Sequence, residues 1–398
     1  MAVLTLVLLG FATVLVIPIA LLFLEVLAAL DPVRAPSFAE PAQLHHIAVV
    51  VPAHNESSGI IPTIRDIQSQ LSAADRLLVV ADNCSDDTAA VAAAEGCEVL
   101  TRNDASKTGK GYALAWSIEH LRANPPDFVI FIDADCRIQS DMIWRLAQAC
   151  ASLKRPLQAC FLMKQADNSP IDHSLAEFAW VLKNWVRPLG LRSLKLPVQL
   201  MGTGMIFSWR DIQNAPLSSG HLVEDMKLGL DLAARRNAPL FFPFVVGISE
   251  FPQTTKGTES QRQRWVKGHL GMIARIPRLL IRAAIDRNPE LFVLTLDLLI
   301  PPLSLLGLLI TFSLVLNLVA VAFGISPVPA FVAIANLLVF ATCIGFAWLR
   351  FGRDIIRPAK FLLLGSMALK RLILYCQILL GRTASGWIRT DRGTHDPK

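Results

Sequence analysis

The sequence predicts an α/β domain, built on a parallel sheet with helices on both faces, between two ends that are apolar enough to lie in a membrane. Two observations lead to this fold class. Between residues 45 and 260, short apolar runs alternate with segments of helical spacing, which is typical of βαβ units. The chain is also 53% hydrophobic, and the excess lies at its two ends, which is typical of a membrane protein with one soluble domain.

Composition narrows the class of protein further. The 398 residues carry a net charge of +6, which basic flanks of membrane segments explain, and no nucleic-acid-binding motif is present. The seven cysteines lack metal-finger spacing and predict reduced thiols of a cytoplasmic domain. The glycine-rich dinucleotide fingerprint and the Walker A loop are absent, so a dehydrogenase and a P-loop NTPase fit poorly.

Residues 1–30 predict a transmembrane helix. Val3 to Leu30 is almost unbroken apolar sequence with a single acidic residue, Glu25, and a span needs about 20 residues. A cleaved signal peptide is the alternative, but no basic region precedes the apolar run. Because Arg34 follows the run and no Lys or Arg precedes it, the positive-inside rule places the N-terminus outside and the next domain in the cytoplasm. Residues 31–44 are a Pro-rich linker.

Residues 45–260 predict the cytoplasmic domain, and polar side chains follow its strands. The expected strands are 47–51, 76–81, 97–100 and 128–132, and the expected helices between them are 60–71, 87–95 and 111–121. The polar residues at the strand ends are Asn55 and Glu56, Asp82 and Asn83, and Asp133 and Asp135. Because open α/β sheets bind ligands at the carboxyl ends of their strands, these side chains are expected to meet at one binding edge.

Asp133 and Asp135 are the centre of this pattern. Side chains at positions i and i+2 of an extended strand leave the same face, and two carboxylates suit Mg²⁺ or Mn²⁺ shared with substrate phosphates. The loop that carries Lys110 opens a helix and offers a cation to a phosphate. Each piece alone is explained by a helix cap or a solvated loop charge, but together they predict a nucleotide-diphosphate site with a metal.

The motifs in chain order resemble a known family. They are Val51-Pro-Ala-His-Asn-Glu56, Val79-Val-Ala-Asp-Asn-Cys-Ser-Asp-Asp-Thr88, Gly109-Lys-Gly111 and Asp133-Ala-Asp135. The series is similar to family-2 inverting glycosyltransferases of GT-A fold and, downstream, to their membrane-bound, cellulose-synthase-like branch, over roughly residues 45 to 275. The fold implied is a Rossmann-like nucleotide-diphospho-sugar transferase domain. Where the family commonly has two consecutive Asp, this chain has Ala81 and Asp82, so the uracil or ribose contact of the first Asp has no counterpart.

The resemblance also implies roles for single residues. Asp225 is the implied general base, with Glu224 supporting it, and Asp133 and Asp135 are the implied metal ligands. The implied acceptor-binding residues are Gly202, Thr203, Gly204 and Trp265. The implied donor-binding residues are Pro52, Asn55, Glu56, Asp82, Lys110, Asp133, Gln261, Arg264 and Trp265. From the residues alone, 202–204 is equally a tight turn, and the two carboxylates are equally charges at a helix start.

Residues 261–290 combine a motif with an amphipathic pattern. Gln261-x-x-Arg264-Trp265 is the signature of the membrane-bound synthases; an Arg can clamp a diphosphate and a Trp can stack on a sugar. The alternative is the first turn of an interfacial helix, kinked at Pro277, and both can hold. Residues 173–196, with aromatic residues among Lys183 and other cations, predict a second membrane-facing element.

Residues 291–349 predict two transmembrane helices, at 303–323 and 331–349, with the part before 303 re-entrant or interfacial. Asp297 in that part is expected to face protein or the path of a saccharide. Residues 350–398 predict an interfacial helix at 359–380, with Lys370 and Arg371 at its centre, and a basic tail. If 359–380 spanned instead, the tail would lie outside.

The expected function is metal-dependent, inverting transfer of a sugar from a nucleotide-diphospho-sugar, with UDP as the expected carrier, to a growing β-linked polysaccharide. The enzyme would be a multi-pass protein of the inner or plasma membrane with Mg²⁺ or Mn²⁺ as cofactor. Single-sugar transfer to a lipid-linked acceptor is one alternative, and a catalytically silent scaffold is another. Expected partners are the donor, the saccharide or lipid-linked acceptor and membrane lipid. Because three spans are few for a channel, a homo-oligomer or an export partner is also considered; nucleic acid is not expected.

Overall fold

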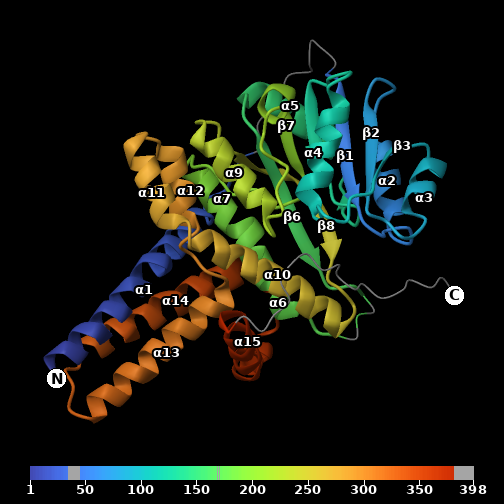
Figure 1. Cartoon of the computed structure of the whole chain (residues 1–398). Coiled ribbons are helices and arrows are strands. Elements are labelled where there is room, and N and C mark those ends of the chain that lie inside the picture. The colour runs from blue at the N-terminus through green and yellow to red at the C-terminus, as the bar shows by residue number, and fades with distance from the viewer. Residues whose placement is uncertain (35–44, 168, 170, 381–398) are drawn as a thin grey trace.

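The computed structural model describes residues 1–34, 45–167, 169 and 171–380, and its centre is an eight-stranded mixed sheet (Figure 1). The strand order is β3-β2-β1-β4-β7-β6-β8-β5. Most of the predicted linker, and the tail from residue 381, lie outside the described residues. The strands are β1 (Ile47–Ala53), β2 (Arg76–Asp82), β3 (Glu98–Arg102), β4 (Phe128–Phe131), β5 (Arg137–Ile138), β6 (Leu157–Lys164), β7 (Met205–Ser208) and β8 (Leu240–Glu250).

The predicted parallel pairing holds for the four predicted strands. Strands β3, β2, β1 and β4 are parallel neighbours, and each lies within a few residues of its predicted range. The rest of the sheet is mixed: β6 and β8 are parallel, but the prediction of a parallel sheet is wrong for β7, which runs antiparallel to both β4 and β6, and for β5, which runs antiparallel to β8. Strands β5, β6 and β8 were not predicted. The carboxyl end of β4 therefore lies beside the start of β7.

Helices cover both faces of the sheet, as predicted. Helices α2 (Ile60–Gln68), α3 (Thr88–Ala94) and α5 (Met142–Leu153) pack on the face that carries Val49 and Ile130. Helices α4 (Lys110–Leu121), α8 (Trp209–Ile212) and α9 (Glu224–Ala234) pack on the face that carries Val50 and Phe131. Because both faces are covered, these strands read as continuous apolar runs rather than as alternating ones.

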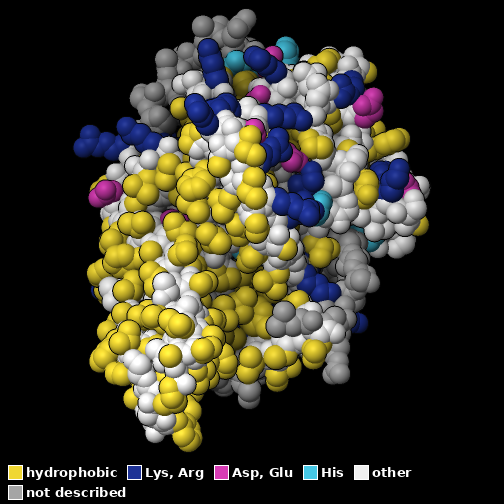
Figure 2. Space-filling model, turned by 60° about the vertical axis from the view of Figure 1, so that its left-hand side comes forward, with side chains coloured by type: hydrophobic (Ala, Val, Ile, Leu, Met, Phe, Trp, Pro, Cys, Tyr) yellow, Lys and Arg dark blue, Asp and Glu magenta, His cyan; other side chains and the backbone are white. Residues whose placement is uncertain are grey.

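Within the described part of the chain, three helices are long and apolar enough to cross a membrane: α1 (Ala2–Ala28), α13 (Leu303–Ala322) and α14 (Val328–Phe351). They lie side by side (Figure 1), and the Asn336 side chain donates a hydrogen bond to the carbonyl of Ala12 at 2.8 Å. In Figure 2, apolar side chains cover this part of the surface, while Lys and Arg gather on the part above it. This division is what a bilayer boundary requires.

The segment predicted to face the membrane packs inside the protein instead. It forms α6 (Ser174–Val181), the π-helix η1 (Leu182–Val186) and α7 (Arg187–Ser193), and its apolar side chains join a cluster with α1 and α14. A Cβ atom at Gly190 of α7 would lie 1.8 Å from the carbonyl oxygen of Glu25, so only glycine allows α1 to approach this closely. Arg187 and Arg192 of this segment face the protein interior, where Arg187 pairs with Glu25 and Asp297 and Arg192 donates to the Phe241 carbonyl at 2.6 Å.

Residues 255–297 form three helices rather than one kinked interfacial helix. Gln261 lies in the second turn of α10 (Thr255–Ile273), not the first, and Pro277 begins α11 (Ile276–Ile285) instead of kinking a continuous helix. This position suits proline because the first turn of a helix needs no N–H donor there. Helix α12 (Pro289–Asp297), predicted to be re-entrant or interfacial, packs against α9 through Leu291 and Leu294.

The last described elements are the 3₁₀-helix η2 (Pro358–Leu363) and α15 (Leu364–Leu379). Helix α15 has 16 residues, fewer than the about 20 that span a bilayer. The hydroxyl groups of Tyr375 and Ser304 are 2.7 Å apart, so α15 is attached beside the first turn of α13. The interfacial position of this helix stays a prediction.

Candidate active site

One continuous cavity borders the carboxyl ends of β1, β2 and β4 and extends to η1, α7, α10 and α12. We call its two parts the sheet end and the helix end. The sheet end is lined by Pro52, Glu56, Asp82, Lys110, Asp133 and Asp135, and the helix end by Lys183, Arg187, His269 and Asp297. Glu224, Asp225 and Trp265 line the cavity as well. Side chains from far apart in the sequence therefore share one cavity, as the strand-end pattern predicts.

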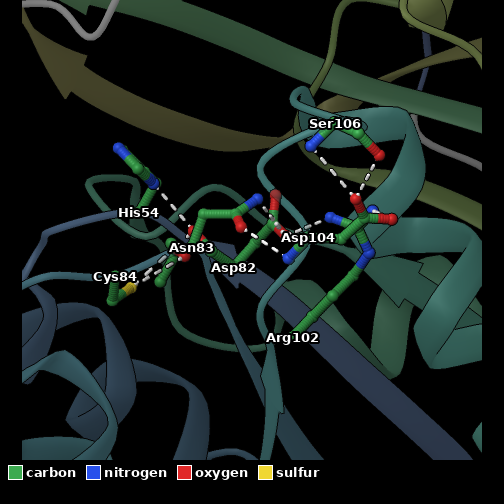
Figure 3. A network of polar contacts seen from close by, with 8 residues as sticks. His54, Asp82, Asn83, Cys84, Arg102, Asp104 and Ser106 are labelled. Atoms are coloured by element: carbon green, nitrogen blue, oxygen red, sulfur yellow. Dashed lines mark hydrogen bonds and ion pairs between the residues drawn. The ribbon is translucent and has the colours of Figure 1, made fainter.

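A polar network holds Asp82 at the sheet end (Figure 3). Arg102 of β3 donates to Asp82 Oδ1 at 2.5 Å, and the Asn83 side chain donates to the same oxygen at 3.1 Å. His54 Nδ1 donates to the Asp82 carbonyl at 2.7 Å. Burial raises the pKa of Asp82, and the Arg102 guanidinium opposes that change. Arg102 thus fixes the carboxylate that the chain retains where Ala81 replaces the family's first Asp.

Four residues converge where the donor and acceptor sides of the site meet. Lys110 Nζ pairs with Asp133 Oδ1 and donates to the Gly202 carbonyl at 2.7 Å. A Cβ at Gly202 would lie 3.5 Å from Asp225 Oδ2 and 3.9 Å from Asp133 Oδ2. Gly202 has a φ of +91°, which other residues rarely adopt. A glycine here leaves room between the predicted base and the predicted metal ligand.

Two of the predicted acceptor-binding residues do not line the cavity. The Asp133 amide donates to the buried Thr203 hydroxyl at 2.9 Å. A Cβ at Gly204 would lie 2.9 Å from the Cβ of Ala159, so this glycine allows close packing on β6. The side chain of Gln158, also on β6, donates to the Thr203 carbonyl and accepts from the Met201 amide. Thr203 and Gly204 hold the turn that presents Gly202.

Asn55 has a structural position as well. Its backbone φ is +56°, a value that Asn tolerates better than most residues. Its Oδ1 accepts from the Ser85 amide at 2.7 Å, and its Nδ2 donates to the Ser85 hydroxyl at 3.1 Å. Asn55 does not line the cavity, whereas Pro52 and Glu56 on either side of it do. It joins the loop after β1 to the loop after β2.

The carboxyl groups of Glu224 and Asp225 occupy the first turn of α9. Burial raises the pKa of Glu224 to about 7, and the charge of Asp225 adds to that effect. Burial also raises the pKa of Asp225, while Lys110 and Lys183 act in the opposite direction. The burial of Lys110 lowers its pKa, but the surrounding carboxylates outweigh burial and raise it overall. Such shifted acids and bases in one cavity are typical of proton-transfer sites.

Gln261, Arg264 and Trp265 all line the cavity from α10. The Trp265 ring lies 4.6 Å from the Trp180 ring of α6, tilted by 41°, and the Trp180 indole donates to the Phe161 carbonyl at 3.1 Å. The second indole and its hydrogen bond hold Trp265 in place. Paired aromatic faces in a cavity suit a sugar ring, whose C–H faces are apolar.

The predicted metal ligands fit a cation that shares its coordination with a substrate. Asp133 and Asp135 offer hard oxygen ligands from one turn after β4, and both line the cavity. Within the described residues, no group of three or more His, Cys, Asp and Glu side chains is placed to hold a metal by itself. A divalent cation here would need the remaining ligands from a diphosphate and water, which is the usual arrangement for Mg²⁺.

The residues of the helix end were not predicted as site residues. Arg187 Nε donates to Glu25 Oε2 at 2.7 Å, and Arg187 Nη2 donates to Asp297 Oδ1 at 2.5 Å. Asp297 therefore faces protein, one of the two positions expected for it. The sequence contains one signal for this ion cluster. Glu25, Arg187 and Asp297 each lie in an apolar segment, and charged residues in such segments are expected to pair, because unpaired charges there are costly.

The open sheet, with its polar strand ends and shared cavity, defines a GT-A nucleotide-sugar transferase fold. The family model described as "Glycosyltransferase like family 2" matches residues 45–268, more than half of the chain. The chain belongs to this family and is a glycosyltransferase. No curated protein matches the chain.

Solved structures agree with the fold. A mannosyltransferase from Pyrobaculum calidifontis, in complex with GDP-mannose and Mn²⁺, matches with a TM-score of 0.55 and 15% identity, over 86% of this chain and 98% of that one. Glucosyl-3-phosphoglycerate synthase from Mycobacterium tuberculosis, in complex with Mn²⁺, UDP-glucose and phosphoglyceric acid, matches with a TM-score of 0.40 and 21% identity, over 62% of this chain and 86% of that one. At these identities the similarity concerns the fold alone. The second match, with a TM-score of 0.40, supports no further conclusion.

Replacing Thr203 separates a structural role from acceptor binding. We expect Thr203→Val to lower the free energy of unfolding by about 1–3 kcal/mol, because the Asp133 amide loses its hydrogen-bond acceptor. Thr203→Ser keeps the hydroxyl and is the matched control. Thermal unfolding of both variants in detergent measures the effect. A normal melting temperature for Thr203→Val, combined with a raised KM for the acceptor, would instead place Thr203 in the acceptor site.

Proposed function

We propose that this protein transfers a sugar, with inversion, from a nucleotide-diphospho-sugar to an acceptor hydroxyl at the cytoplasmic face of a membrane. One observation supports this most directly. The predicted base Asp225 and the predicted metal ligand Asp133 face each other across Gly202, within 4 Å of the position that a Cβ there would take. Both carboxylates therefore border the place where the anomeric carbon would lie if Asp225 acts on the attacking oxygen and Asp133 holds the metal at the leaving diphosphate.

The donor would bind at the sheet end. Asp82, held by Arg102, would accept hydrogen bonds from the nucleoside, while Pro52 and Glu56 would border it. Arg264 and Lys110 would face the diphosphate, since cations neutralise its charge. A Mg²⁺ or Mn²⁺ held by Asp133 and Asp135 would supply further positive charge to the leaving diphosphate. The expected donor is a UDP-sugar.

Asp225 would act on the acceptor side. The acceptor oxygen attacks the anomeric carbon, its proton passes to Asp225, and the bond to the diphosphate breaks with its electron pair leaving on the nucleoside diphosphate. Direct attack from the side opposite the leaving group inverts the configuration, so an α-linked donor gives a β-linked product. Glu224, with its raised pKa, would support the charge state of Asp225, and Trp265 would stack on the acceptor sugar.

The acceptor has two candidate forms. A growing β-linked polysaccharide is the one that the Gln261-to-Trp265 motif favours, with an oligomer or an export partner to complete the path. A lipid-linked acceptor is the second, favoured by the extension of the cavity to α7 and α12 beside α1. A catalytically silent scaffold is less well supported, since Asp133, Asp225 and Trp265 all line one cavity.

The membrane position rests on the three long apolar helices. The C-terminal end of α1, the start of α13 and the end of α14 meet near the sheet domain (Figure 1), and Arg34, Arg350 and Arg353 lie in the sequence near these helix ends. Basic residues at the ends of α1 and α14 favour a cytoplasmic position for those ends. We therefore propose a multi-pass protein of the inner or plasma membrane with its transferase domain inside the cell.

The proposed reaction is tested with purified full-length protein in nanodiscs that contain native membrane lipids. We expect release of nucleoside diphosphate from one member of a panel of UDP- and GDP-sugars in the presence of Mn²⁺. This release is expected to stop with EDTA and to recover when Mn²⁺ is restored, because the cation that Asp133 and Asp135 would hold neutralises the charge of the leaving diphosphate. Product size then separates a polymer from a single addition to lipid. Silence across the panel, with added acceptors, would favour the scaffold.

The role of Asp225 is tested by Asp225→Asn. We expect transfer to fall by about 10² to 10⁴-fold, since an amide cannot accept the proton, while donor binding measured by titration calorimetry stays within twofold. Asp231→Asn is the matched control, because Asp231 lies on the same helix and pairs with Lys227. Equal activity of both variants would remove Asp225 from the reaction.

The pH dependence follows from the raised pKa values of Glu224 and Asp225. A base works only when deprotonated, and a raised pKa keeps its proton bound to a higher pH. We therefore expect kcat/KM to be constant in the alkaline range and to fall as the pH drops from about 7 toward about 4, because Asp225, the base, takes up its proton at a higher pH than an unshifted carboxylate does. An ordinary carboxylate would keep its activity to about pH 4. A flat profile between these values would contradict the assignment.

A further inference from the structure

The helix end of the cavity contains a lysine, Lys183, whose charge has no ion-pair partner among the described residues. Lys183 lines the cavity from η1, and among the described residues its ammonium forms no ion pair within 4 Å. The ammonium lies over the Trp180 ring, 5.4 Å from its centre. Burial lowers the pKa of Lys183, and the charge of Asp225 opposes that change. An ammonium in this position gains most from an anionic ligand.

Arg187, one turn further along, is already neutralised. Lys183, Arg187 and Leu191 follow each other at intervals of four residues and all line the cavity, so they share one face of the continuous η1–α7 segment. The Arg187 guanidinium forms ion pairs with Glu25 of α1 and Asp297 of α12. Of these two cations, Lys183 is the one that remains available to a ligand.

A second observation indicates that the helix end takes a polar ligand. His269 of α10 also lines it, and the Nε2 atom of this ring is buried without a hydrogen-bond partner in the described structure. Burial lowers the pKa of His269 to about 4, and the nearby Lys183 and Arg187 add to that effect. An anion beside Lys183 would favour protonation of the His269 ring, whose Nε2 could then donate to that anion.

The position of the helix end relative to the bilayer indicates that its ligand is a lipid. Glu25, the partner of Arg187, lies three residues before the end of α1 at Ala28. A helix of 27 residues is about 40 Å long, while the apolar core of a bilayer is about 30 Å thick. The last turn of α1 therefore reaches the level of the lipid headgroups, and so does the η1–α7 segment that it contacts.

We propose that the helix end of the cavity is a subsite for the anionic headgroup, a phosphate or a carboxylate, of a lipid-borne acceptor, and that Lys183 is its principal contact. That this lipid is the acceptor rests on the proposed function, whereas the binding of an anionic lipid does not. Asp225, which shares the cavity and interacts electrostatically with Lys183, would then meet the part of the lipid next to its headgroup.

The test measures binding without any donor. Full-length protein is placed in phosphatidylcholine nanodiscs that contain either a polyprenyl phosphate or the matching neutral polyprenol, and native mass spectrometry records which lipid stays bound. We expect the wild type to retain the phosphate lipid and Lys183→Met to weaken its retention by at least about tenfold, the size of one charge-assisted hydrogen bond. Lys183→Arg, which keeps the charge, is expected to retain it.

Lys195→Met is the matched control, since Lys195 is an exposed residue just after α7 and does not line the cavity. Equal retention by Lys183→Met and Lys195→Met would overturn the proposal, as would equal retention of polyprenol and polyprenyl phosphate. Displacement of the lipid by inorganic phosphate at an equal concentration would overturn its lipid part. Melting temperatures of all variants show whether lipid retention is lost because a variant is misfolded. If Lys183→Met is misfolded, the result for Lys183→Arg decides the outcome.

The result of the lipid-binding test can be distinguished from the result of the test of the proposed reaction. Binding that depends on Lys183, together with silence in the donor panel, would leave the subsite standing and refute the transfer. Transfer to a neutral polysaccharide that Lys183→Met leaves unchanged, together with no lipid binding, would do the reverse. If Lys183→Met slows transfer to every acceptor equally, shifts the acid limb of the pH profile and leaves lipid retention intact, Lys183 serves Asp225 alone and the subsite is refuted.

Discussion

The position of the membrane helices relative to the transferase domain depends on Arg187. Its guanidinium joins two carboxylates, Glu25 of α1 and Asp297 of α12, at 2.7 Å and 2.5 Å. Removing charges from water costs several kcal/mol per ion unless each is paired and hydrogen-bonded. The three helices therefore have one arrangement in which all three charges are satisfied. Close packing supports it, because Gly190 lets the α7 backbone touch the carbonyl of Glu25.

The two carboxylates predicted to take part in the reaction are held from two sides. Asp133 follows a central strand of the sheet, and the Thr203 hydroxyl fixes its backbone. Asp225 stands on α9, which packs against the sheet through Leu228 and against α12 through Met226. Since α12 ends at Asp297, the same ion cluster that positions α1 also supports the helix that carries the predicted base. The distance between base and metal ligand is thus set by both the sheet and the membrane-proximal helices.

Much of the donor half of the fold could be predicted from the sequence, because parallel strands must bring their carboxyl ends to one edge. Asp82 and Asp133 line one cavity for that reason. The pairing of the strands in the second half of the domain could not be predicted, because the sequence of an apolar run such as 240–250 does not indicate whether the strand pairs in parallel or antiparallel. Asn55 and Thr203 were assigned to ligands because they adjoin the cavity in sequence, yet their side chains bond to protein. Lys183 was assigned to the membrane because composition does not reveal which face of a helix is covered.

The antiparallel pairing of β4 with β7 has a consequence for how such enzymes diverge. Most of the predicted donor-binding residues come before β5, and the predicted base and acceptor-binding residues come after β6, yet the two sets meet because one strand ends where its neighbour begins. Mutations that remodel the acceptor side can therefore accumulate in the second half of the chain without disturbing nucleotide recognition in the first. A single scaffold can in this way keep one sugar donor while its descendants glycosylate different acceptors.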